Sequence, residues 1–383
     1  MRGAQACPPM NAILATYRIA AKDEAEARAL AIDLCYEQTA ELPPDLVSPA
    51  ITERFVAKTL DLKASTPGTW LAQVAFNPEC AGPDFPQFLN LLWGNISLKP
   101  GFRLEGLSLP QDFLKQFPGP KLGGVGWRAL TGIQHRPLVC TALKPMGLSA
   151  QELADQAFAM ALGGVDCIKD DHGLADQGMA PFAQRIQRVQ EAIVKAGAKT
   201  GRQSIYIPNV TGTQEHLLER AHFAKQQGVK ALMLLPGLQG LDSLRALAQA
   251  NLGLPIMAHP AGLGSFVTSN GNGIAHHLIF GTLLRLAGAD ATVFPSFGGR
   301  FGFTEDECRG IGAACRDPLG TFPSILPAPG GGMTAERLKA MRRAYGRDAM
   351  YLVGGGLRRL DPDLTTSCQK FLALVESIEK EMQ

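Results

Sequence analysis

The sequence predicts an α/β protein in which a (β/α)8 TIM barrel follows a small α+β domain. Eight short apolar runs alternate with amphipathic stretches in the C-terminal two thirds of the chain. Such runs are typical of buried parallel strands, and eight of them over about 250 residues favour a closed barrel. Polar or turn residues follow nearly every run, and the strand ends of a barrel share the face that carries active sites. A doubly wound open sheet is the alternative, which the count of eight disfavours.

The first expected domain spans residues 1–130 and is α+β, of ferredoxin-like type. The segment ILATYRIA alternates as a strand does, and Gly94 is expected to stop a helix. A turn-rich linker, with several Pro and Gly residues, is expected at 115–137. The expected elements of this domain are a strand at 13–20, a helix at 24–38, a strand at 70–77 and a helix at 85–93.

The second expected domain, residues 131–383, holds the barrel and the active site. Helical patterns separate the apolar runs, for example at 213–228, 273–287 and 334–346. The expected strands are 138–145, 167–172, 204–211, 231–237, 255–261, 291–297, 324–331 and 350–356.

Composition excludes several classes of protein. The chain has 383 residues, of which 46% are hydrophobic and 19% charged, a globular balance that excludes a disordered chain. The net charge of +2 provides no bulk field for nucleic acid or anionic lipid. No apolar stretch reaches about 18 residues, so no membrane span is expected. The eight cysteines form no CxxC pair and no secretory signal precedes them, so we expect reduced thiols in a cytoplasmic protein.

The segment KDDH at residues 169–172 ends the second expected barrel strand. Side chains alternate along a strand, so Lys169 and Asp171 share a side. With His172 they could form a divalent-metal site, and a carboxylate suits Mg²⁺. An unmodified lysine would repel the metal, whereas a lysine carbamate formed with CO₂ would be an anionic ligand. The alternative is a solvated polar loop, which the position at a barrel strand end disfavours.

Two further candidates for proton transfer end other strands. Lys144, before Pro145, could donate or accept a proton if its neighbours lower its pKa. The alternative is a surface lysine. His259 ends the fifth strand and could be an acid, a base or a substrate contact, or a structural histidine bonded to the backbone.

Glycine triplets end the seventh and eighth strands and indicate a phosphorylated substrate, because backbone N–H groups at such turns bind phosphate. Ser296 and Arg300 could add to this anion site. Asn209 could bind a substrate oxygen or a metal, or it could cap the turn at Thr211. The glycines expected to contact phosphate are Gly330, Gly331, Gly354 and Gly355.

These residues, in this order, resemble the RuBisCO superfamily over most of the chain. HRPLVCTALKPMGLS resembles the first-strand motif and carries its lysine as Lys144. GGVDCIKDDHGLADQ resembles the motif with the carbamylated lysine, here Lys169. IPNVTG resembles the third-strand motif with Asn209. LLWGNISL resembles the motif of the N-terminal domain whose asparagine, here Asn95, reaches the active site of the neighbouring subunit, and Glu37 in YEQT matches the glutamate of that domain.

Several departures from the family pattern make carboxylation of ribulose bisphosphate improbable. Met146 replaces a catalytic lysine, and His172 replaces the last acidic residue of KDDE. Pro260 replaces the arginine that follows the strand-five histidine. Val293 and Pro329 replace a histidine and a serine of the carboxylases. Arg300 falls near their mobile-loop lysine.

The chain therefore resembles a RuBisCO-like protein of form IV, and FPSFGGRFGF and AHPAG resemble the branch that acts on methylthio-pentulose phosphates. The resemblance implies a homodimer with shared active sites, Mg²⁺ (with Mn²⁺ as an alternative) and a carbamate on Lys169. It implies enolisation of a phosphorylated ketose, first of all by a 5-methylthioribulose-1-phosphate isomerase of sulfur salvage. A 2,3-diketo-5-methylthiopentyl-1-phosphate enolase and a decarboxylase of a sugar-acid phosphate are alternatives. A catalytically inactive barrel with a binding or regulatory role is the alternative of another class.

Overall fold

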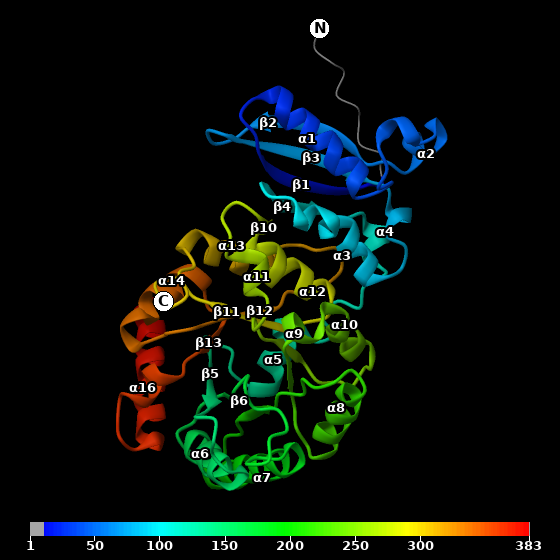
Figure 1. Ribbon diagram of the computed structural model, residues 1–383. Coiled ribbons are helices and arrows are strands. Elements are labelled where there is room, and N and C mark those ends of the chain that lie inside the picture. Colours follow the sequence, from blue (N-terminus) through cyan, green and yellow to red (C-terminus); the bar gives the residue numbers. More distant parts are fainter. Residues whose placement is uncertain (1–10, 383) are drawn as a thin grey trace. The chain divides into compact units, whose positions relative to one another are not determined.

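The computed structural model describes residues 11–382, which form two compact units (Figure 1). The first unit holds residues up to Phe117 together with Leu263–Ile279, and the second holds Pro118–Gly262 and the residues from Phe280 onward. The expected boundary at 130/131 therefore differs from the division in the structure. A helix within the expected linker accounts for the difference, because Trp127 of this helix is buried in the core of the barrel.

The first unit contains one five-stranded sheet with the order β10-β4-β1-β3-β2. β1 pairs antiparallel with both β3 and β4, and every second side chain of β1 is buried. β10 comes from the barrel half of the sequence and pairs parallel with β4, which joins residues 263–279 to this unit. The strands are β1 (Ile13–Ala20), β2 (Lys58–Ala64), β3 (Thr69–Phe76), β4 (Phe102–Ser108) and β10 (Gly273–Ile274).

Helices complete the first unit. The expected helices at 24–38 and 85–93 are present as α1 and α3, and Asp23 caps α1 by accepting a hydrogen bond from the Glu26 N–H group. The helices are α1 (Glu24–Glu37), α2 (Pro49–Arg54), α3 (Phe85–Trp93), α4 (Gln111–Leu114) and α11 (Gly264–Val267), with short 3₁₀ turns η1 (Pro44–Leu46), η2 (Pro78–Cys80) and η3 (Asn95–Leu98).

The second unit is the barrel, and its eight strands fall inside the eight expected runs. They form the parallel ladders β13-β5-β6-β7 and β12-β11-β9-β8. A bridge between Asn209 and Met233 joins β7 to β8, and β12 and β13 are neighbours at the other seam. The strands are β5 (Leu138–Leu143), β6 (Cys167–Asp170), β7 (Ile205–Ile207), β8 (Leu232–Leu234), β9 (Ile256–Ala258), β11 (Ala291–Pro295), β12 (Leu326–Gly330) and β13 (Met350–Leu352). The expected fold class is confirmed.

Helices follow the barrel strands, and α6 begins with a capping box in which Ser149 and Glu152 satisfy each other's backbone N–H groups. The helix expected at 273–287 is wrong as a single element, because its first residues pair with β4 as β10. The helices of this unit are α5 (Gly123–Thr131), α6 (Ala150–Leu162), α7 (Phe182–Thr200), α8 (His216–Gln226), α9 (Pro236–Gln239), α10 (Leu241–Gln249), the π-helical η4 (Leu278–Leu283), α12 (Leu284–Leu286), α13 (Glu305–Arg316), the 3₁₀ turn η5 (Ala335–Arg337), α14 (Leu338–Tyr345), α15 (Gly355–Arg358) and α16 (Leu364–Glu381).

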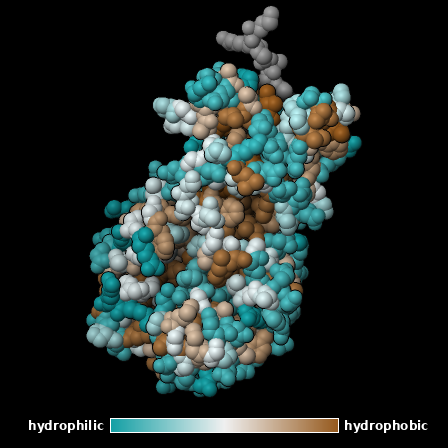
Figure 2. Space-filling view, viewed as in Figure 1, coloured by the Kyte–Doolittle hydropathy of each residue, from teal (hydrophilic) through white to brown (hydrophobic). Residues whose placement is uncertain are grey.

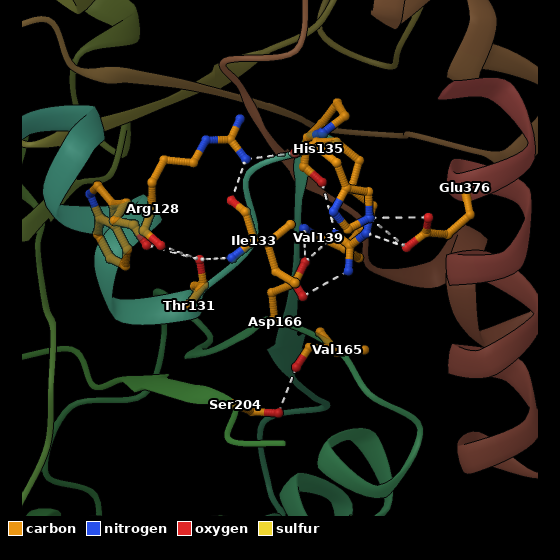
Figure 3. A network of polar contacts seen from close by, with 12 residues as sticks. Arg128, Thr131, Ile133, His135, Val139, Val165, Asp166, Ser204 and Glu376 are labelled. Carbon is orange, nitrogen blue, oxygen red and sulfur yellow. Dashed lines mark hydrogen bonds and ion pairs between the residues drawn. The ribbon is translucent and has the colours of Figure 1, made fainter. Parts of the chain in front are cut away.

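Side chains that point inward from the strands fill the barrel, and small residues such as Cys140, Ala231 and Ala328 alternate there with larger ones. Below this core, a polar network anchors the starts of β5 and β6. The Asp166 carboxylate accepts two hydrogen bonds from the Arg136 guanidinium, at 2.6 and 3.0 Å, and one from the Val139 N–H group. Figure 3 shows Asp166 in this network and Glu376 reaching toward it from α16. These bonds hold the N-terminal ends of β5 and β6 in place.

Hydrophilic residues dominate the surface in view in Figure 2, with apolar patches between them. No helix within residues 11–382 is long and apolar enough to cross a membrane. The seven described cysteines are all free, and Cys7 lies outside the described residues.

Candidate active site

Four polar residues that follow three barrel strands converge at one place. Lys144 follows β5, Asp171 and His172 follow β6, and His259 follows β9. Lys144 Nζ lies 2.8 Å from Asp171 Oδ1, and His172 Nδ1 lies 3.3 Å from the same oxygen. The rings of His172 and His259 stack with centroids 4.7 Å apart. The structure thus brings together residues that are more than 100 positions apart in the sequence.

The Asp171 carboxylate is held in its charged form. Its partial burial alone would raise its pKa, but hydrogen bonds from His172 and Lys144 and the nearby positive charges lower the pKa of Asp171 well below its usual range. Asp171 is therefore an anionic oxygen donor at the mouth of the barrel.

Lys169 lies inside the barrel directly below this cluster, with only 2% of its surface exposed. Its Nζ donates a hydrogen bond of 2.7 Å to the carbonyl oxygen of Asp170. Burial lowers the pKa of Lys169, and the charge of Lys144 acts in the same direction. A lowered pKa favours the neutral amine, which is the form that can react with CO₂ to give a carbamate.

The donors at this place fit a hard divalent cation when Lys169 is carbamylated. Asp171 and the carbamate would then supply anionic oxygens, and the Lys144 ammonium already occupies a cation position against Asp171. His172 would supply a nitrogen, which is a poorer ligand for Mg²⁺ than a carboxylate. Without the carbamate, no group of three or more His, Cys, Asp or Glu side chains within residues 11–382 is placed to hold a metal.

His259 is held as a neutral imidazole. Burial is the main cause that lowers its pKa well below 6.5. Its Nδ1 accepts a hydrogen bond of 3.3 Å from the Ala261 N–H group. The proton of the neutral ring therefore lies on Nε2, which makes His259 a hydrogen-bond donor there.

Asp170, between two candidate site residues, carries a second network that the sequence analysis missed. Its carboxylate accepts hydrogen bonds from Arg185 Nε at 3.1 Å, from the Tyr206 hydroxyl at 2.8 Å and from the Asn209 N–H group at 3.0 Å. Asp170 and Arg185 are fully buried. Because Lys169 and Asp171 point into the barrel, the intervening residue must point outward, and this alternation is the signal that could have predicted a buried partner.

The Asn209 side chain caps turns in this structure. Its Nδ2 donates to the carbonyl oxygens of His172 and Leu174, at 3.2 and 2.8 Å, and its Oδ1 accepts from the Thr211 N–H group at 3.1 Å. Of the two interpretations left open by the sequence, these bonds favour the turn-capping one. Asn209 therefore holds the loop that carries His172.

Ser296 and Arg300, the expected anion-binding residues after β11, differ in exposure. The Ser296 hydroxyl is buried and lies 2.8 Å from the Tyr345 hydroxyl, so it faces into the protein. The Arg300 N–H group donates to the Gly331 carbonyl oxygen at 3.2 Å, while the Arg300 side chain is exposed and stacks on Phe301. Gly331 has a φ of +81°. A side chain at Gly331 would be strained and would also contact Phe301.

After β13, Gly354 precedes α15 and Gly355 is its first residue. The first N–H groups of a helix have no acceptor within the helix, so this turn presents donors. The side chain of Arg358, at the other end of α15, donates to Gln156 Oε1 at 2.8 Å and to the Ala142 carbonyl oxygen at 3.3 Å. Neither Gln156 nor Arg358 was singled out by the sequence analysis.

Met146 places a flexible apolar side chain at the same mouth. Half of its surface (51%) is exposed. A Cβ atom on Gly173 would lie 2.4 Å from Met146 Cε and 4.0 Å from Asp171 Oδ2. The methyl end of the Met146 side chain therefore lies against Gly173, which is also near the Asp171 carboxylate.

In the first unit, the two candidate residues Glu37 and Asn95 form a pair. Asn95 Nδ2 donates to Glu37 Oε1 at 3.1 Å, and Lys99 Nζ lies 2.7 Å from Glu37 Oε2. These bonds hold the pKa of Glu37 below its usual value. The sequence motif that contains Asn95 and the one that contains Glu37 are thus brought to one place.

Comparisons with protein families, curated proteins and solved structures all find relatives of ribulose bisphosphate carboxylase. The family model described as ribulose bisphosphate carboxylase large chain, catalytic domain, matches residues 125–358. A 5-methylthioribulose-1-phosphate isomerase of Rhodospirillum rubrum is 37% identical over 366 residues, covering 94% of this chain and 95% of that protein. A 2,3-diketo-5-methylthiopentyl-1-phosphate enolase of Geobacillus kaustophilus is 33% identical over 310 residues, covering 80% and 75%. The crystal structure of a Rubisco-like protein from Rhodopseudomonas palustris has a TM-score of 0.88 and 37% identity, covering 96% and 98%.

Proposed function

Because the chain belongs to the ribulose bisphosphate carboxylase large-chain family, as one of its RuBisCO-like members, we propose that it enolises a phosphorylated ketose. The observation that carries the proposal is the convergence of Lys144, Asp171 and His259 above the buried Lys169. Enolisation needs a base for the α-proton and groups that stabilise the oxygen on which negative charge develops. This cluster supplies both kinds of group.

The first proposed activity is isomerisation of 5-methylthioribulose 1-phosphate in sulfur salvage, in a cytoplasmic setting. Its support is the isomerase of Rhodospirillum rubrum, which is similar over nearly the whole chain. The second candidate is the 2,3-diketo-5-methylthiopentyl-1-phosphate enolase reaction, which several relatives at 32–33% identity favour. Both substrates carry a methylthio group, and the half-exposed Met146, which lies against Gly173, supplies apolar surface that suits such a group.

Asp171, a carbamylated Lys169 and His172 are the residues that would hold Mg²⁺, or Mn²⁺ in its place. When bound, the ion would supply a Lewis acid that polarises a carbonyl oxygen. The position of Lys144 depends on the same carboxylate, since its ammonium contacts Asp171. Occupation of the site by a divalent cation would compete with this ion pair and free the Lys144 side chain.

Each residue of the cluster then has a role. The carbamate of Lys169 is one candidate base for the α-proton, and Lys144 is the other, which accepts this proton only as the neutral amine. His259, neutral and protonated on Nε2, would donate a hydrogen bond to an oxygen of the enediolate. Because its protonation state does not change, a neutral donor of this kind stabilises charge without taking up the proton.

The turns at Gly330, Gly331, Gly354 and Gly355 are the proposed phosphate contacts, and a single phosphate is required. The buried Ser296 hydroxyl takes a supporting part in this proposal, because it contacts Tyr345. Arg300, whose side chain is exposed and stacks on Phe301, is a further candidate for contact with the anion.

We also propose a homodimer in which Asn95 and Glu37 serve the active site of the partner subunit. Its support is the resemblance of both motifs to those of the N-terminal domain and the hydrogen bond that pairs Asn95 with Glu37.

A titration with Mg²⁺ and Mn²⁺, followed by NMR, tests the proposed function. We expect solvent deuterium to enter 5-methylthioribulose 1-phosphate in a metal-dependent manner and an isomeric ketose phosphate to form. Conversion of the diketo compound in place of this substrate would favour the second candidate. A complete lack of metal-dependent exchange with either compound would contradict the enolisation proposal.

A further inference from the structure

We propose that Gln156 and Arg358 are positioning residues that hold Lys144 for the enolisation. The inference rests on the proposed function for its chemical readout. Gln156 lies on α6 and Arg358 ends α15, so the two side chains join a helix after the first barrel strand to a helix after the last.

The hydrogen bonds form a continuous connection to Lys144. Gln156 Oε1 accepts from the Lys144 backbone N–H group at 3.3 Å and from Arg358 Nη2 at 2.8 Å. Arg358 Nη2 also donates to the carbonyl oxygen of Ala142, within β5, at 3.3 Å. One amide oxygen therefore fixes the backbone of Lys144, and one guanidinium fixes that amide against the strand.

Lys144 needs such an anchor because of where it lies. β5 ends at Leu143, so Lys144 is beyond the strand ladder, and the next residue, Pro145, has no N–H group to donate. More than a third of the Lys144 side chain is exposed. A long side chain on an unanchored backbone would sample many positions, and the catalytic geometry tolerates displacements of only about 1 Å.

The lack of partners among the described residues for part of the Arg358 side chain indicates more than a structural contact. Within residues 11–382 it has no carboxylate partner, and its Nε is buried without a hydrogen bond. Burial lowers the pKa of Arg358. A partly buried guanidinium without a carboxylate partner loses hydration and gains no ion-pair energy, so a role in stability alone does not account for it.

Four variants test the proposal. Gln156→Leu and Arg358→Ala remove the acceptor and the donor. Gln156→Glu keeps an acceptor oxygen in the same place. Arg359→Ala is the matched control, because Arg359 is exposed and adjacent. For each variant, kcat and KM for 5-methylthioribulose 1-phosphate are measured, and thermal unfolding identifies variants that fail to fold.

We expect Gln156→Leu and Arg358→Ala to lower kcat about 10- to 100-fold with little change in KM. Gln156→Glu should retain most of the wild-type kcat, and Arg359→Ala should match the wild type. A kcat within about 2-fold of wild type for Gln156→Leu, or a loss confined to KM, would overturn the proposal.

Crystal structures of the metal-free wild type and metal-free Gln156→Leu give a readout without substrate. The Lys144–Asp171 ion pair should be present in the wild type and lost or displaced in the variant. An unchanged pair would overturn the positioning role. If the wild type catalyses no exchange at all, the proposed function fails, and this comparison still decides the positioning role.

Discussion

Lys144 Nζ and Asp171 Oδ1 lie 2.8 Å apart, although the two residues follow different strands of the barrel. The pair forms because β5 and β6 are adjacent, with Leu143 in register with Asp170. Each residue one position further then extends over the same end of the barrel. Two residues that are 27 positions apart in the sequence thus form an ion pair above Lys169.

If Lys144 and Asp171 act as a unit, the losses in kcat caused by substituting each of them should be strongly non-additive. We expect Lys144→Ala and Asp171→Asn each to lower kcat at least 100-fold, and the double variant to be no worse than the more damaging single variant. A double-mutant cycle on deuterium exchange measures this. Asp155→Asn, at an exposed position of α6, is the control. Fully additive losses would show that the two residues act independently.

Met146 should favour substrates with an apolar tail. We expect Met146→Ser to lower kcat/KM for 5-methylthioribulose 1-phosphate about 10-fold and to leave kcat/KM for ribulose 1-phosphate nearly unchanged, because a hydrophobic contact of this size contributes about 1–3 kcal/mol to discrimination. Val125→Ser changes an exposed apolar residue of α5 and is the control. Equal losses for both ketoses would contradict a contact between Met146 and the methylthio group.

The Asp170–Arg185 pair should be essential for stability. Arg185→Met leaves the buried Asp170 carboxylate without its charged partner, and we expect it to lower the free energy of unfolding by about 3–5 kcal/mol. Arg188→Met, on the exposed side of the same helix, should cost less than about 1 kcal/mol. Urea unfolding measures both. A small effect of Arg185→Met, comparable with that of Arg188→Met, would show that the network does not support the strand end.

Glu376 should stabilise the fold in a pH-dependent manner. Partial burial alone would raise its pKa, but hydrogen bonds from Arg136 and His135 lower the pKa of Glu376 below its usual value of 4.5 (Figure 3). A carboxyl group whose pKa is lower in the folded than in the unfolded state stabilises the fold above its usual pKa, and this contribution disappears as the pH falls through the lowered value.

Glu376→Gln should therefore be less stable than the wild type at pH 6, by about 1 kcal/mol or less because Glu376 is partly exposed, and the difference should shrink toward pH 3. Chemical unfolding across this pH range measures the difference. Glu53→Gln, an exposed substitution in the first unit, is the control. A difference that stays constant or grows on acidification would contradict the assigned role of Glu376.

The barrel could be predicted because its strands are buried on both sides and read as apolar runs. β2 and β4 could not, because KTLDLKA and FRLEGLS carry charged residues on half-exposed strands. α5 was also missed, since GGVGWRALT is rich in glycine. Its start depends on Asp290, far away in the sequence, whose carboxylate accepts hydrogen bonds from the Leu122 and Gly123 N–H groups.

The residues of the candidate site likewise divide into those that could be predicted from the sequence and those that could not. Lys144, Lys169, Asp171 and His259 could be singled out because each is a polar residue at or near the end of an apolar run. Gln156 could not, because it lies in the middle of an ordinary helix and its role depends on two distant partners. Side-chain orientation was likewise beyond the sequence, as Ser296 shows by pointing to Tyr345.

The central claim is that this barrel enolises a phosphorylated ketose by means of Lys169 and the residues above it. Incubation of wild type and Lys169→Ala with 5-methylthioribulose 1-phosphate, Mg²⁺ and bicarbonate in D₂O tests it most directly. NMR should show deuterium entering the carbon next to the carbonyl with the wild type and a loss of at least about 100-fold with a folded Lys169→Ala variant. Equal exchange by both proteins, or none by the wild type, would contradict the claim.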